Sequence, residues 1–171
     1  VGILAAVLAG MLTASLFAFV TLVLVANQVA SGLALTLLGL GFAALIGEPY
    51  ANKPGVKLEQ IHIPGLSDIP FVGPIVFGQD PLVYVTVLLV IGVSWFLFRS
   101  RGGLILRAVG DNHGSAHALG YGVVRVRFLA VLFGGACAGL AGAYLSLVST
   151  SQWLDNMTAG RGWIALALVV F

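Results

Sequence analysis

The first 47 residues, VGILAAVLAGMLTASLFAFVTLVLVANQVASGLALTLLGLGFAALIG (residues 1–47), contain no charged side chain. As one straight helix they would measure roughly 70 Å at ~1.5 Å per residue, more than twice the ~30 Å thickness of a membrane hydrocarbon core. Two membrane spans are therefore expected, over about 1–24 and about 29–47. The polar pair Asn27-Gln28 places the reversal of the chain near 25–28.

The rest of the chain has the same apolar character. Of its 171 residues, 60% are hydrophobic and 8% are charged, whereas soluble domains carry about 25% charged residues. This composition excludes a soluble protein and predicts an all-α integral membrane protein, a polytopic helical bundle of about five spans. The third and fourth spans are expected at 82–98 and 128–148, and the apolar run 164–171 opens a fifth helix.

Both ends of the chain lie in apolar runs, and there is no initiator Met. We therefore expect residues 1–171 to form one transmembrane domain that is an interior piece of a longer membrane protein. The single cysteine, Cys137, allows no disulfide within the chain and is interpreted as a small packing residue.

The charged residues separate into two windows between spans. Window 48–81 holds two Lys, four acidic residues and all six prolines, so we expect a loop outside the bilayer, with one short strand at 56–63. Window 99–127 holds five Arg and one Asp. Because cytoplasmic loops carry the excess of Lys and Arg, window 99–127 is predicted to face the cytoplasm and window 48–81 to be extracytoplasmic. The connection 149–163 is then also outside.

The sequence lacks the common catalytic signatures. It has no Walker A motif, HExxH, CxxC or nucleophile elbow, so no catalytic residue, metal ligand or cofactor is assigned. The spans also hold no Asp, Glu, Lys, Arg or His, although ion-driven carriers usually place such a group at membrane depth. Active transport by this chain would therefore need energy from another subunit. The open alternatives are a secondary transporter or channel subunit, and a structural subunit of a membrane complex.

Two residue patterns occur within the spans, one of small residues and one of uncharged polar residues. In the fourth span, stripes of small residues spaced by four would allow close helix packing; they are Gly134, Ala138 and Gly142, and Gly135, Gly139 and Ala143. In the second span, uncharged polar side chains share a helical face that suits either a path for a neutral hydroxylated solute or hydrogen bonds between helices; they are Asn27, Gln28, Ser31 and Thr36.

A short helix is predicted inside the basic window. Asp111 or Asn112 can cap its start, and Gly120 and Gly122 can end it, which leaves a helix of about seven residues at 113–119. Such a helix is too short to be stable alone in water, so it must dock on something. It is interpreted either as an ordinary interfacial helix or as a docking helix for a cytoplasmic partner.

The stretch GLILRAVGDNHGSAHALGYGVVRVRFLAVLFGGACAGLAGAYLSLVS (103–149) resembles the permease subunits of bacterial ABC importers for branched-chain amino acids, ribose-type sugars and nucleosides. The shared positions are Gly103, Arg107, Ala108, Val109, Gly110, Asn112, Ala116, Gly120, Gly134, Ala138, Gly139, Gly142 and Ala143. His117 departs from the family pattern, which most often has a second Ala there. ANQVASGLALTLLGLGFAALIG and MTAGRGWIALALVVF are also similar to the family, and the latter favours its nucleoside or simple-sugar branch.

The resemblance implies a function in the bacterial plasma (inner) membrane. Such a permease is not itself an enzyme. It pairs with a second permease subunit, two cytoplasmic ATPase subunits and an extracytoplasmic solute-binding protein or lipoprotein, and it binds no nucleic acid. The short helix would couple ATPase motion to the bundle, through Asn112, His113, Ala116, His117, Leu119 and Gly120. The solute would be a nucleoside or a simple sugar.

Overall fold

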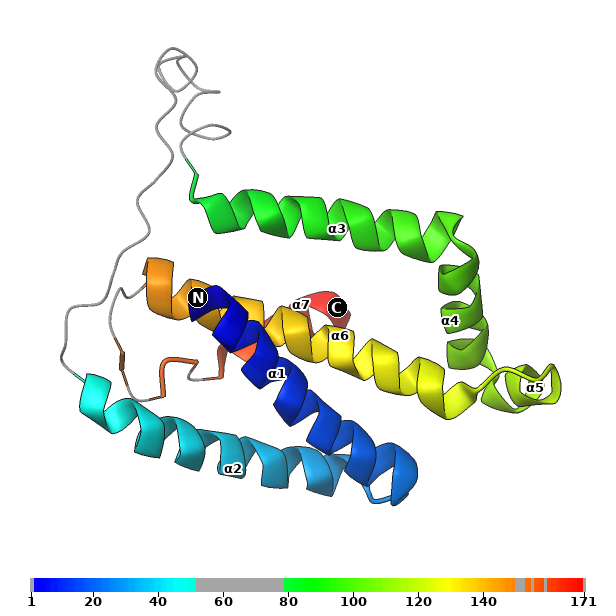
Figure 1. Cartoon of the computed structure of the whole chain (residues 1–171), viewed down its shortest axis with the longest axis horizontal. Coiled ribbons are helices and arrows are strands. Elements are labelled where there is room, and N and C mark those ends of the chain that lie inside the picture. Colours follow the sequence, from blue (N-terminus) through cyan, green and yellow to red (C-terminus); the bar gives the residue numbers. More distant parts are fainter. Residues whose placement is uncertain (1, 52–78, 150–152, 155, 159, 171) are drawn as a thin grey trace, which may run out of the picture. The chain divides into compact units, whose positions relative to one another are not determined.

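The computed structural model describes residues 2–51, 79–149, 153–154, 156–158 and 160–170. These residues are mainly helical (Figure 1), which confirms the predicted all-α class. The elements are α1 (Gly2–Ala18), η1 (Phe19–Val23), α2 (Gln28–Gly47), η2 (Glu48–Tyr50), α3 (Pro81–Arg99), α4 (Arg101–Asp111), α5 (His113–Ala118), α6 (Val123–Tyr144), η4 (Leu145–Ser149) and α7 (Arg161–Val170). The strand expected at 56–63 lies outside the described residues, as does most of window 48–81.

Four helical segments are long and apolar enough to cross a membrane: Gly2–Val23, Gln28–Tyr50, Pro81–Arg99 and Val123–Ser149. They coincide with the first four predicted spans, with ends shifted by a few residues. The shorter apolar helix α7 begins close to the expected start of the fifth. The chain is therefore a multi-pass membrane protein.

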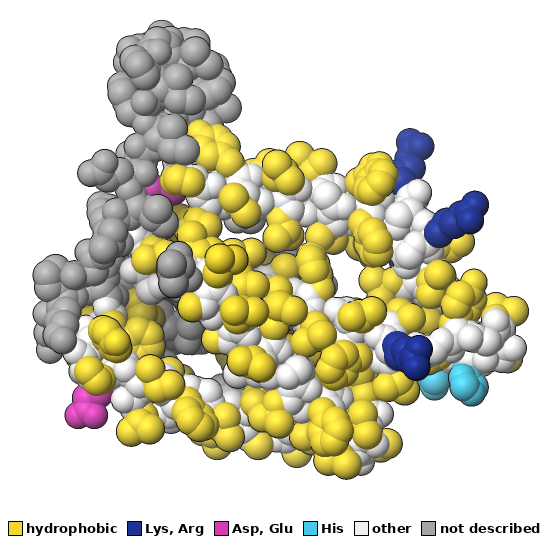
Figure 2. Space-filling model, in the orientation of Figure 1, with side chains coloured by type: hydrophobic (Ala, Val, Ile, Leu, Met, Phe, Trp, Pro, Cys, Tyr) yellow, Lys and Arg dark blue, Asp and Glu magenta, His cyan; other side chains and the backbone are white. Residues whose placement is uncertain are grey.

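Apolar side chains cover the visible face of the molecule, as the yellow surface in Figure 2 shows. Among the described residues the buried apolar side chains are few and mostly small: Ala18, Leu82, Val109, Ala116 and Ala143. Every membrane-spanning helix carries leucines that are more than half exposed, for example Leu12 at 70% and Leu88 at 73%. Exposed apolar surface of this extent requires lipid or other protein around it.

The chain divides into two compact units, residues 1–57 with 131–171 and residues 58–130. In the first unit, α1 continues into the π-helical η1, where the buried Thr21 hydroxyl donates to the Phe17 carbonyl oxygen at 2.8 Å. The chain then reverses through Val25, whose φ is 53°, and α2 begins at Gln28. The reversal predicted near 25–28 is confirmed.

Small residues bring α1 and α6 close together within the first unit. A Cβ built on Gly10 would overlap the Gly135 carbonyl oxygen and lie 3.0 Å from the Gly139 Cα. A Cβ built on Gly139 would overlap the Ala6 carbonyl oxygen and lie 2.9 Å from the Val7 Cα. Backbone therefore contacts backbone at this crossing, and only glycine leaves enough room for it.

The second unit contains an elbow between α3 and α4. Ser100 makes both of its hydrogen bonds, because its Oγ donates to the Phe96 carbonyl oxygen at 2.7 Å and accepts from the Gly103 N–H at 2.9 Å. Ser100 is thus the N-cap of α4, and its extended backbone ends α3. The sequence analysis predicted only the short helix at 113–119 in window 99–127, so α4 is a second helix that it did not predict.

Gly103 allows the elbow to close. A Cβ at this position would overlap the Phe96 carbonyl oxygen and lie 2.6 Å from the Leu97 Cα, both of which are backbone atoms of α3. Gly110, on the same helix, has no atom of the described chain within 4 Å of a built Cβ. Gly103 and Gly110 of α4 therefore differ in what a side chain would meet.

We expect Gly103→Leu to lower the apparent Tm of the purified full-length protein by several degrees, because α4 must move away from α3. Overpacking of this kind costs typically about 1–3 kcal/mol. Gly110→Leu is the matched control and should melt close to wild type, measured in the same detergent by differential scanning fluorimetry. Equal melting of both variants would contradict the close approach at Gly103.

Candidate functional site

The short helix α5 is defined at both ends by specific backbone hydrogen bonds. Asn112 has extended backbone and is the N-cap, and its Oδ1 accepts from the Ser115 N–H at 3.0 Å. At the other end, the Gly120 N–H donates to the His117 carbonyl oxygen at 2.9 Å, and the Tyr121 N–H donates to the Ala116 carbonyl oxygen at 3.1 Å. This pair of bonds is a Schellman motif, and Gly120 with φ 87° takes its left-handed position.

The structure resolves the alternatives for these ends. Asn112, not Asp111, caps the helix, and Gly120, not Gly122, ends it. The helix proper is one residue shorter than the predicted 113–119, because Leu119 is its C-cap. Backbone groups at both ends of α5 have hydrogen-bond partners, and these bonds stabilise a six-residue helix that would not form in isolation.

The side chains of α5 divide into a buried and an exposed set. Ala116 is buried, with 3% of its surface exposed, and α5 contacts α4. His113, His117 and Leu119 are exposed, and Leu119 is 77% exposed. His113 and His117 are one helical turn apart, and the cyan side chains in Figure 2 show histidine at the surface. The helix therefore presents imidazoles and one large apolar side chain outward.

We expect Asn112→Ala to destabilise α5 by about 1 kcal/mol, because an N-cap hydrogen bond is lost. Hydrogen exchange of the full-length protein should then be about fivefold faster at the amides that α5 protects. Asn112→Ser keeps an N-capping oxygen and should exchange nearly as slowly as wild type. Unchanged exchange in Asn112→Ala would show that the cap does not stabilise the helix.

The uncharged polar residues of α2 have differing environments. The Asn27 Oδ1 accepts from the Val29 and Ala30 N–H groups at 2.9 and 3.2 Å, so Asn27 caps α2. The Thr36 hydroxyl donates to the Gly32 carbonyl oxygen at 2.8 Å, within the same helix. Gln28 and Thr36 are exposed, and Ser31 is half-buried. The oxygen of Asn27 is therefore already used by the helix backbone.

The two small-residue stripes of α6 lie on different surfaces. Gly135 and Gly139 face α1, and Ala143 is buried. Gly134 and Gly142 have no described atom within 4 Å of a built Cβ, and Ala138 is exposed. The partner stripe on α1 was missed: Ala6, Gly10 and Ala14 contact α6, and their spacing of four in the sequence was the available signal.

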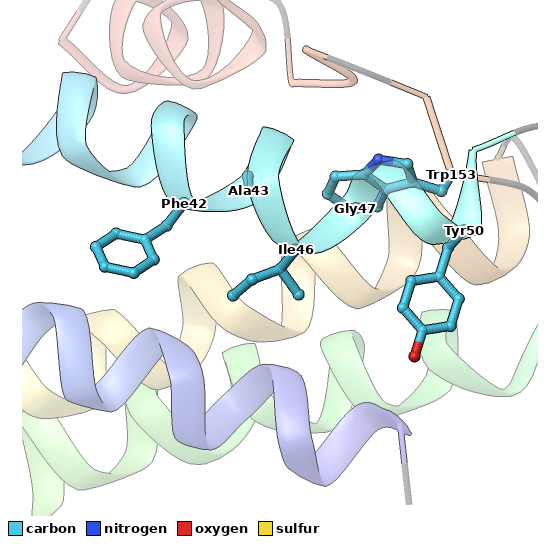
Figure 3. Close-up of a pocket in the computed structure, with 6 residues that line it drawn as sticks. All are labelled: Phe42, Ala43, Ile46, Gly47, Tyr50 and Trp153. Carbon is cyan, nitrogen blue, oxygen red and sulfur yellow. The ribbon is translucent and has the colours of Figure 1, made fainter.

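An apolar hollow of about 250 Å³ lies beside the end of α2 (Figure 3). Its lining residues are Phe42, Ala43, Ile46, Gly47, Tyr50 and Trp153. The Trp153 ring packs directly on the Gly47 backbone, and a backbone bridge joins Ala51 to Trp153. The Trp153 Nε1 is buried and has no hydrogen-bond partner among the described residues. Nothing in the sequence pattern distinguishes these side chains from an ordinary lipid-facing surface.

Within the part of the chain that the structure describes, no group of three or more His, Cys, Asp or Glu side chains could hold a metal ion. Cys137 is a free, half-buried thiol on α6. An assignment of function therefore depends on the exposed short helix α5 and on the apolar membrane-spanning helices.

These features define a multi-pass membrane protein whose Arg-rich window 99–127 carries a capped, exposed helix. The chain belongs to the branched-chain amino acid transport system / permease component family, whose model matches residues 1–171. The family resemblance at 103–149 is thereby confirmed. No solved structure matches the chain.

Three relatives are sugar or nucleoside permeases by name. The chain is 42% identical over 166 residues to a putative glucose ABC transporter permease protein of Haloferax volcanii, and the match covers 95% of this chain and 50% of the relative. It is 34% identical over 178 residues to the guanosine ABC transporter permease protein of Bacillus subtilis, with coverage of 99% and 55%. A nucleoside ABC transporter permease protein of Lactococcus lactis is 33% identical, with coverage of 99% and 55%. The chain thus spans about half the length of these relatives.

Proposed function

We propose that this chain is part of the transmembrane permease subunit of an ATP-driven importer in the plasma membrane, and that the solute is a simple sugar or a nucleoside. The match to the permease family over residues 1–171 carries this proposal. The names of the relatives support the two solute classes. Both classes are uncharged and hydroxylated, which suits spans whose central parts hold no Asp, Glu, Lys, Arg or His.

In this proposal α5 receives the motion of a cytoplasmic ATPase subunit. His113, His117 and Leu119 form the contact surface, because they are exposed on one short helix. Asn112, Ala116 and Gly120 shape that helix through its cap, its buried side and its left-handed end. ATP hydrolysis then belongs to separate subunits, and the permease itself is not an enzyme.

The elbow gives this contact a mechanical route into the membrane. α5 contacts α4, and α4 is fixed to α3 by the two Ser100 hydrogen bonds and by the close approach at Gly103. A push on α5 would therefore move the end of a membrane-spanning helix instead of bending a loose loop. Motion of packed helices as rigid pieces is a common way to transmit such a change.

The remaining assignments follow from the same proposal. Window 99–127 faces the cytoplasm, and windows 48–81 and 149–163 face an extracytoplasmic solute-binding protein or lipoprotein. A second permease subunit completes the path. Gln28, Ser31 and Thr36 of α2 are candidates for its lining, whereas Asn27 is less suited because its amide oxygen caps the helix. The open stripe of Gly134, Ala138 and Gly142 is a candidate contact with parts of the permease outside this chain.

The test is uptake of labelled glucose and labelled guanosine by cells that express the full-length permease with its neighbouring transporter genes. Accumulation of one of them should require both the permease and an intact ATPase subunit. Accumulation that persists with a hydrolysis-deficient ATPase would indicate a channel or secondary transporter and would overturn the proposal.

A further inference from the structure

Three arginines lie on the helices that form the elbow of the second unit. Arg99 is the last residue of α3, and Arg101 is the first residue of α4. Arg107 lies farther along α4, yet its Cζ is 5.1 Å from the centroid of the Phe98 ring. Since Phe98 is next to Arg99, the guanidinium of Arg107 reaches back toward the end of α3. All three arginines are exposed.

This cluster has no carboxylate partner in the described part of the chain. Asp111 is the single acidic residue of window 99–127 and lies one turn beyond Arg107, but the Arg107 guanidinium lies over Phe98 instead. In Figure 2, separate dark-blue side chains project near the place where α3 ends and α4 begins, with no magenta side chain beside them on this face. Like charges held close together repel, so an anion bound between them would be favourable.

The position of Arg99 along α3 identifies the source of that anion. A helix of 19 residues is about 28 Å long at ~1.5 Å per residue, close to the ~30 Å hydrocarbon thickness. Arg99 therefore falls at the level of the lipid headgroups. Phe98, which is 68% exposed in the same turn, has an aromatic ring at the depth where such rings are enriched.

We propose that Arg99, Arg101 and Arg107 bind the phosphate of an anionic phospholipid at the α3–α4 elbow. Guanidinium groups bind phosphate oxygens through paired, charge-assisted hydrogen bonds. Phe98 holds Arg107 in place through the cation–π contact and packs beside the acyl chains. A protein partner is less suited to this cluster, because its arginines lie at headgroup depth while the exposed residues of α5 lie beyond α4.

Binding at this place would stabilise the elbow. The lipid phosphate would join Arg99 at the end of α3 to Arg101 and Arg107 in the first two turns of α4. These contacts would add to the two hydrogen bonds of Ser100. This inference concerns lipid binding to the permease alone, so it does not depend on the solute or on an ATPase.

The test uses the purified full-length permease in nanodiscs of phosphatidylcholine with or without roughly 20–30% phosphatidylglycerol, a composition range chosen to give a clear surface charge. We expect the anionic lipid to raise the Tm of wild type and to stay bound in native mass spectrometry. The triple variant Arg99→Gln/Arg101→Gln/Arg107→Gln should lose most of the Tm increase and at least about tenfold in lipid affinity, equivalent to ~1.4 kcal/mol. Arg125→Gln/Arg127→Gln, which removes two other arginines of the same window, is the control and should keep both.

Two further arms keep the result interpretable. If the triple variant does not fold, Arg101→Gln should show a smaller loss and Arg101→Lys should restore part of it. Inorganic phosphate at the same phosphate concentration, in phosphatidylcholine discs, should give no stabilisation. Equal lipid retention by wild type and by the arginine variants would overturn the proposal. Stabilisation by free phosphate equal to that by lipid would also overturn it.

Discussion

Replacing Leu119 with aspartate is expected to abolish ATP-driven uptake while the protein still reaches the membrane. Leu119 is 77% exposed at the C-cap of α5, so its side chain packs little against the rest of the described chain. If it fits an apolar hollow on an ATPase subunit, a carboxylate there would be buried without a partner. Leaving a buried charge without a partner costs on the order of 3–5 kcal/mol, which corresponds to a loss of more than about a hundredfold in association.

The measurement is solute uptake per permease molecule in the membrane, with membrane content determined by immunoblot. Leu119→Met keeps an apolar side chain of similar size and should transport at close to the wild-type rate. Leu119→Asn has the shape of aspartate without the charge and should fall between them. Wild-type uptake in Leu119→Asp would remove α5 from the coupling role.

The second large effect is expected at the crossing of α1 and α6. Gly139→Leu would drive a side chain into the Ala6 carbonyl and the Val7 Cα, which are backbone atoms of a helix and cannot rotate away. Small-residue crossings of this kind depend on close backbone approach. We expect little folded protein, seen as loss of at least about tenfold in the monodisperse fraction after detergent extraction, equivalent to ~1.4 kcal/mol or more.

Gly41→Leu is the matched control, because it introduces the same side chain into a membrane-spanning helix, α2, at a position where no described atom lies within 4 Å of a built Cβ. It should be recovered at close to the wild-type level. Gly139→Ala adds only the Cβ and should be intermediate. Recovery of Gly139→Leu at the wild-type level would show that α1 does not approach α6 at this glycine.

The spans were predictable because a membrane helix leaves a strong signal in composition. A run of about 20 apolar residues without charge is typical of a membrane span and rare in soluble domains, and the pair Asn27-Gln28 was sufficient to divide the first 47 residues. The ends of α5 were predictable for a similar reason. Asn before and Gly after a short run are typical of an N-cap and a left-handed C-terminal residue.

The elbow was not predictable from the same patterns. α4 is amphipathic, and its mixture of apolar and basic residues is also typical of a loop that follows a span. Hydropathy does not indicate that the Ser100 hydroxyl both donates and accepts a hydrogen bond. The close approach at Gly103 depends on how α4 turns back against α3, which is a tertiary property. For the same reason the sequence showed two small-residue stripes on α6 but not which of them faces α1.

The candidate path on α2 stays a prediction. Shared polarity on one face of α2 suggested a lining surface, but Asn27 uses its oxygen as a cap and Thr36 bonds back to its own helix. Short polar side chains often bond to nearby backbone in this way, so polarity alone does not indicate a path. The aromatic hollow at Phe42, Tyr50 and Trp153 had no sequence signal, since its parts are more than a hundred residues apart.

The most direct test of the account is a crosslink from α5. The full-length protein would carry Cys137→Ser, which removes the half-buried native thiol of this chain, and Leu119→Cys at the exposed end of α5. It would be co-expressed with ATPase subunits that carry surface cysteines, and a Trp163→Cys variant, on α7 of the other unit, would serve as control. We expect a disulfide to the ATPase from position 119 only, with a yield that changes when nucleotide is added. If position 119 forms no crosslink to any ATPase, and instead reacts with an impermeant thiol reagent from outside the cell, both the orientation and the coupling role are contradicted.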